Sequence, residues 1–115
     1  MEVLEIQDKI KKAEADLKST LVNLDQKVKE DLNSSDSWYN RELMGIPTWE
    51  KELRKEADRR RIKRAAMLWA AHRAGRAKAE ADFQKTISEI EALIVECRKD
   101  PKFVAEFDAR LGGGR

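Results

Sequence analysis

Apolar residues recur at every third or fourth position along the first third of the chain. The residues between them are mostly lysine, glutamate, aspartate and glutamine. The spacing averages about 3.6 residues, which is the period of an α-helix, so the apolar residues lie on one face. The pattern predicts one amphipathic helix over residues 3–32. Its apolar members are Val3, Ile6, Ile10, Ala13, Leu17, Leu21, Leu24, Val28 and Leu32.

A run of short polar residues, 33–37, predicts the end of this helix. Serine, asparagine and aspartate side chains compete with the helix for backbone hydrogen bonds. Asp36 or Ser37 would then cap a short helix over residues 37–44, and Gly45 fits its C-terminal cap.

The second half of the chain predicts one long helix over residues 49–98, because no strong helix breaker occurs there. Either this helix bends, with Gly75 as its weakest point because glycine is a poor helix former, or it is continuous and the molecule is elongated. Asp100 followed by Pro101 is typical of a helix start and predicts a C-terminal helix over residues 101–111.

No run of alternating apolar and polar residues predicts a sheet. We therefore expect an all-α fold over residues 1–115 as a single domain. It would be an elongated bundle or hairpin of about four helices with a long central helix. Within that helix one apolar stripe has heptad spacing, typical of a short coiled coil, and predicts a homodimer or higher oligomer. The self-association residues are Phe83, Ile87, Ile90 and Ile94.

Charge is distributed unevenly, although the net charge is only +2. Residues 49–78 carry eleven basic and four acidic side chains, whereas the segments 1–36 and 79–115 are each net acidic. A basic centre of this kind can meet a polyanion, or it can meet the acidic ends of a neighbouring copy. The acidic first helix is an expected packing partner for the basic helix, within the chain or from a second chain.

The basic residues of the long helix lie mostly on its outer face, Arg64 among them, while Ile62 and Trp69 fall on its apolar face. Arg61 and Arg76 intrude on the apolar face and would need a carboxylate, a helix end or a subunit boundary to satisfy them. The outer face either keeps the helix soluble or contacts phosphates without much sequence preference. The residues of the second hypothesis are Arg59, Arg60, Arg61, Lys63, Arg64, Arg73 and Arg76. A membrane-surface helix is disfavoured, because the opposite face is mostly alanine.

Catalytic chemistry is not indicated. The one histidine, His72, is better placed for packing than for acid–base catalysis, and Cys97 continues the apolar stripe as a core residue. No phosphate loop, metal-ligand spacing or cofactor motif occurs, so we expect no enzyme, no cofactor and no metal site. The absence of a signal-like or membrane-spanning segment favours a cytoplasmic protein.

Three aromatic residues, Trp38, Tyr39 and Trp49, surround the predicted elbow between the helices. They either plug the end of a helical bundle or anchor a protein partner, since interface hot spots favour tryptophan and tyrosine. We expect a small helical protein-interaction module, an adaptor, inhibitor or assembly factor, that binds other proteins and self-associates. The alternative is a nucleic-acid-binding accessory protein that contacts phosphates through the basic face of helix 49–98.

Overall fold

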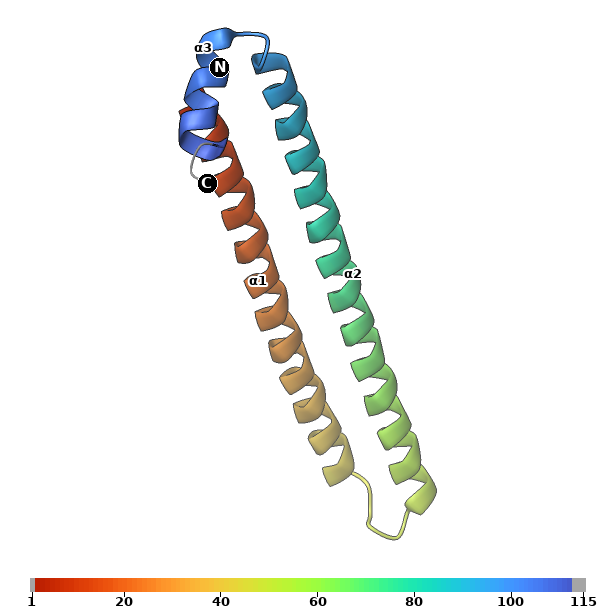
Figure 1. Cartoon of the computed structure of the whole chain (residues 1–115). Helices are drawn as coiled ribbons and strands as arrows, with labels where there is room; N and C mark the ends of the chain where they lie inside the picture. The colour runs from red at the N-terminus through yellow and green to blue at the C-terminus, as the bar shows by residue number, and fades with distance from the viewer. Residues whose placement is uncertain (1, 113–115) are drawn as a thin grey trace. The chain divides into compact units, whose positions relative to one another are not determined.

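The computed structural model describes residues 2–112 of the 115-residue chain, and the side chains of residues 2–110. The order of elements is α1 (Val3–Met44), α2 (Lys51–Cys97), α3 (Pro101–Phe107) and a π-helical turn, η1 (Asp108–Gly112) (Figure 1). This part of the chain contains no strand, which confirms the expected all-α fold. It contains three α-helices, however, and the prediction of about four was wrong.

The missing boundary is the one predicted at residues 33–37, through which α1 continues without a break. Two of the polar side chains there, Ser35 and Asp36, bind α2. Ser35 is buried, and its Oγ accepts a hydrogen bond from Arg64 Nε at 3.2 Å. Asp36 Oδ1 accepts one from Arg61 Nε at 3.0 Å. The inward stripe of α1 therefore continues past Leu32 with polar members.

Helix α2 also runs without interruption, and Gly75 lies inside it. A Cβ atom placed on Gly75 would lie 2.9 Å from Leu24 Cδ2, closer than side chains normally approach. The glycine therefore allows α1 and α2 to approach closely at this point.

The chain forms two compact units. The three-helix unit combines the start of α1, up to Thr20, with the end of α2 from Ala79 onward and with α3. The two-helix unit, Leu21–Lys78, contains the rest of α1, the connecting loop and the start of α2. Within the two-helix unit the helices are antiparallel, because residues late in α1 contact residues early in α2.

The three-helix unit has an apolar core of four buried residues, Val3, Ile6, Ile90 and Phe103. Asp100 caps α3 as predicted: its Oδ1 accepts a hydrogen bond from the Lys102 backbone N–H at 3.0 Å. The cap directs α3 back over the core, where Phe103 is 4% exposed.

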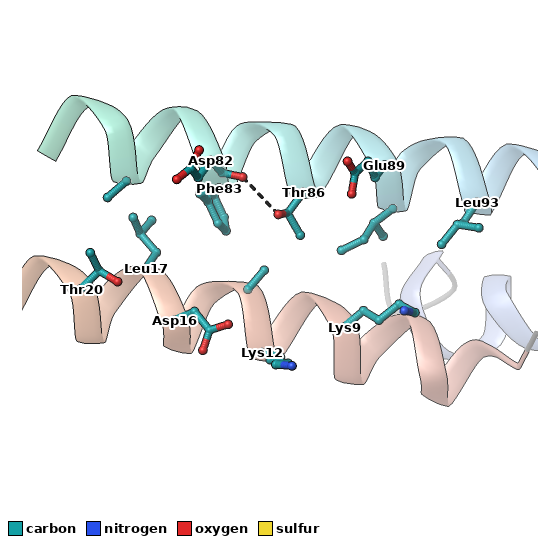
Figure 2. A pocket seen from close by; sticks show the side chains of 13 residues that line it. Lys9, Lys12, Asp16, Leu17, Thr20, Asp82, Phe83, Thr86, Glu89 and Leu93 are labelled. Carbon is teal, nitrogen blue, oxygen red and sulfur yellow. Dashed lines mark hydrogen bonds between the residues drawn. The ribbon is translucent and has the colours of Figure 1, made fainter. Parts of the chain in front are cut away.

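The predicted self-association stripe lies largely in this same core. Ile90 is 4% exposed, and the half-buried Ile87, Ile94 and Cys97 pack against the core. Phe83 is half-buried in an open groove of about 440 Å³ between α1 and α2 (Figure 2). Most of the stripe is therefore in contact with α1 and α3 of the same chain.

Candidate functional site

The two-helix unit holds its helices together with a series of polar contacts. Each contact joins one side chain of α1 to one or two side chains of α2. They are Asp25 with His72 and Arg76, Ser35 with Arg64, Asp36 with Arg61, Tyr39 with Asp58, and Glu42 with Arg60. We call this set the polar ladder. It uses the charge complementarity between the acidic first helix and the basic long helix inside a single chain.

The polar ladder includes four of the seven residues predicted to contact phosphates: Arg60, Arg61, Arg64 and Arg76. Arg61 and Arg76 have carboxylate partners, one of the alternatives that their intrusion on the apolar face left open. Arg64 is half-buried toward α1, so its predicted place on the outer face was wrong. The other three, Arg59, Lys63 and Arg73, are exposed and take part in none of the ion pairs between described residues.

His72 lies beneath one end of the ladder, with only 12% of its side chain exposed. Its Nε2 lies 2.7 Å from Asp25 Oδ1, and its ring meets the edge of Trp69 at a centroid distance of 5.6 Å. The hydrogen bond with His72 holds the pKa of Asp25 below its ordinary value, and the Arg76 charge acts in the same direction. Sequence reasoning did not identify Asp25 as the partner of His72, because it comes from another helix.

Tyr39 takes part in the ladder near its other end. Its hydroxyl donates to Asp58, and the Arg61 guanidinium lies 4.8 Å from its ring centre. The bond to Asp58 favours the protonated phenol and raises the pKa of Tyr39 above its ordinary value. The tyrosine of the predicted partner-binding set therefore holds α1 against α2.

The two tryptophans of the predicted partner-binding set differ from Tyr39, because both are exposed. Trp38 is 60% exposed on α1, and Trp49 is 76% exposed in the loop between α1 and α2. This loop is held by short backbone contacts and by Arg54 Nη1, which donates to the Ile46 carbonyl at 3.3 Å. Within the described chain, the two indoles do not plug the end of the helix pair.

Sequence reasoning also missed several exposed apolar residues of the two-helix unit. Ile62 and Trp69 are 68% and 44% exposed, although the helical pattern placed them on the apolar face. The reason is rotational: α2 turns Ala57, Arg64 and neighbouring positions toward α1 to complete the polar ladder. That rotation moves Ile62 and Trp69 toward solvent.

Large exposed apolar side chains are concentrated in this one unit. Of the ten among the described residues, eight lie between Leu21 and Lys78, and Leu4 and Val95 lie in the three-helix unit. The eight are Val22, Trp38, Met44, Trp49, Leu53, Ile62, Met67 and Trp69. All three tryptophans of the protein are among them. They do not form one patch: on α2, Leu53 and Met67 lie on the opposite side of the helix from Ile62 and Trp69.

A groove runs between α1 and α2 on one face of the two-helix unit. Its volume is about 530 Å³, and it is open to solvent. The α1 wall is formed by Asp31, Ser34 and Ser35, and the α2 wall by Arg64, Met67 and Leu68. Trp38 follows Ser34 and Ser35 by one helical turn, so it lies beyond one end of the groove on the same face of α1.

No helix of the described residues is long and apolar enough to pass through a membrane. The same residues hold no group of three side chains suited to binding a metal ion. No protein-family model, no curated protein and no solved structure matches the chain.

Proposed function

We propose that the chain is a helical protein-interaction module, an adaptor, inhibitor or assembly factor, whose partner binds the two-helix unit. The observation that carries the proposal is the exposure of Trp38 and Trp49 at 60% and 76%. Leaving an indole in water forgoes the free energy of its burial, and tryptophan is enriched among residues that dominate protein interfaces.

The alternative proposal, phosphate contact through the basic face of α2, has weaker support. Four of its seven residues belong to the polar ladder, so a phosphate would have to compete with their partners in α1. Arg59, Lys63 and Arg73 remain exposed and could neutralise only a few phosphates. Exposed tryptophans contribute nothing to such a face unless bases stack on them.

Self-association is also proposed, but it has weaker support than binding to a different protein. Its predicted residues contribute to the core of the three-helix unit, where Ile90 is buried. If copies associate, the exposed apolar residues of the two-helix unit offer more uncovered surface than that stripe does.

The proposal is tested by comparing the proteins retained from a native extract by the full chain and by a Trp38→Ala, Trp49→Ala variant. Val95→Ala is the matched control, because Val95 is 68% exposed but lies in the three-helix unit. We expect discrete proteins to bind the wild type and the control and to be lost with the double variant, while circular dichroism stays unchanged. An identical set of proteins on all three chains would refute the proposal. Retention that a nuclease abolishes would favour the alternative.

A further inference from the structure

We infer that the groove lined by Asp31, Ser34, Ser35, Arg64, Met67 and Leu68 receives an amphipathic helix of the partner protein whose apolar stripe is bordered by acidic residues. This inference rests on the proposed function and names the chemistry of the partner. It is carried by the shape of the groove, by the apolar residues beside it and by the charges around it.

The groove suits apolar side chains that project from a helix. Met67 on its α2 wall is 64% exposed, and Trp38 beyond its end is 60% exposed. Methionine adapts to partners of different shape because its side chain is flexible and polarisable. The small residues Ser34 and Ser35 leave room between the helices. The described chain contains helices and loops but no strand and so offers no sheet edge, which makes a docking helix the recognition mode that this surface can support.

Arg64, on the α2 wall of the groove, carries a guanidinium nitrogen that lacks an acceptor. Arg64 Nε donates to Ser35 Oγ, while its Nη2 is covered and has no hydrogen-bond partner among the described residues. A covered guanidinium nitrogen without an acceptor lowers stability, so an acidic side chain that reaches it restores a charge-assisted hydrogen bond.

Three exposed basic residues lie near the groove, whose lining itself holds one acidic residue, Asp31. Lys27 lies one turn before Asp31, Arg41 follows Trp38 by three residues, and Lys63 precedes Met67 by one turn. All three are exposed, and none forms an ion pair with another described residue. Two basic positions on α1 and one on α2 therefore lie near the groove, and they favour acidic residues on the flanks of a docked helix.

Charge and exposure also argue against a second copy as the occupant. The two-helix unit has fourteen basic and nine acidic residues, so two such units in contact would each bring a net charge of +5. The three-helix unit has thirteen acidic and ten basic residues, but among described residues its large exposed apolar side chains are only Leu4 and Val95. Neither unit combines acidic flanks with a free apolar stripe.

The test is a displayed library of amphipathic helical peptides with randomised apolar and charged positions, selected on the immobilised full chain. Enriched peptides are then titrated against wild type, Met67→Glu and Ile62→Glu by fluorescence anisotropy. The two variants are matched, because Met67 and Ile62 are 64% and 68% exposed on the same helix, and only Met67 lines the groove. We expect peptides with acidic flanks to be enriched. Met67→Glu should weaken their binding about tenfold or more, and Ile62→Glu about twofold or less.

Several outcomes would overturn the inference. They are failure to enrich any peptide, enrichment without an acidic bias, and equal losses for Met67→Glu and Ile62→Glu. A doubled mass of the free chain in light scattering, abolished by Met67→Glu alone, would assign the groove to a second copy. Displacement of the peptides by duplex DNA at physiological salt would assign the face to nucleic acid. If the Trp38, Trp49 variant still loses its partners while Met67→Glu keeps them, the proposed function stands and the groove inference fails.

Discussion

The close approach of α1 and α2 at Gly75 makes a quantitative prediction. In an unhindered helix, replacing glycine by alanine stabilises the fold by about 1 kcal/mol. Here the new Cβ would lie 2.9 Å from Leu24 Cδ2 and 3.3 Å from its Cδ1. Forcing an extra carbon into a packed contact costs about 1–3 kcal/mol. We therefore expect Gly75→Ala to change the free energy of unfolding by between about 0 and −2 kcal/mol, where the unhindered value is about +1.

Removing the obstructing side chain should reverse the sign. In a Leu24→Ala background nothing of Leu24 beyond its Cβ remains, so Gly75→Ala should stabilise the protein by about 1 kcal/mol. The double-mutant cycle then gives a coupling of about 1–3 kcal/mol, and the cost of Leu24→Ala itself cancels. The measurement is urea unfolding of the four chains, followed by far-UV circular dichroism. Equal stabilisation by Gly75→Ala in both backgrounds would refute the close approach.

Three further predictions concern the polar ladder and the core. The one tyrosine, Tyr39, should ionise above its ordinary pKa in an absorbance titration, and Asp58→Asn should lower that pKa; a normal titration in the wild type would contradict the bond. Because the folded pKa of Asp25 is depressed, its pairing stabilises the fold above the ordinary aspartate pKa and is lost as pH falls through the depressed one. Asp25→Asn should thus be less stable than wild type near neutral pH, with the two urea curves converging in acid; a gap independent of pH would count against the pairing. Ile87→Asp combined with Ile90→Asp should disrupt helicity, because Ile90 is buried within the chain; a fully helical monomer formed from a wild-type oligomer would instead restore the self-association stripe.

Part of this architecture can be read from the sequence because it depends on local pattern. The apolar period predicts the first thirty residues of α1, and Asp100 with Pro101 predicts the start of α3. The intrusion of Arg61 and Arg76 on an apolar face left a carboxylate, a helix end or a subunit boundary as alternatives, and the structure shows a carboxylate for each.

What the sequence does not show is the register between α1 and α2. Ser35 predicts a helix end when only its neighbours in the sequence are considered. Its partner Arg64 is 29 positions away, so their hydrogen bond cannot be inferred from local pattern. The rotation of α2 toward α1 likewise leaves Ile62 exposed, although the apolar pattern of α2 alone predicts that Ile62 is buried. Leu24 packs close to Gly75 in this register, whereas the sequence alone marks a glycine within a helix only as a weak point.

The central claim, that a protein partner covers the tryptophans of the two-helix unit, is tested most directly by site-specific photo-crosslinking. A benzophenone amino acid replaces Trp49 in the full chain, and the chain is illuminated in cells that produce it. The control carries the same probe at Ala77, which is exposed on α2 in the same unit. The account predicts a discrete adduct with a different protein from position 49 and none from position 77. No adduct at position 49, or an adduct only with a second copy of the 13.3 kDa chain, would contradict it.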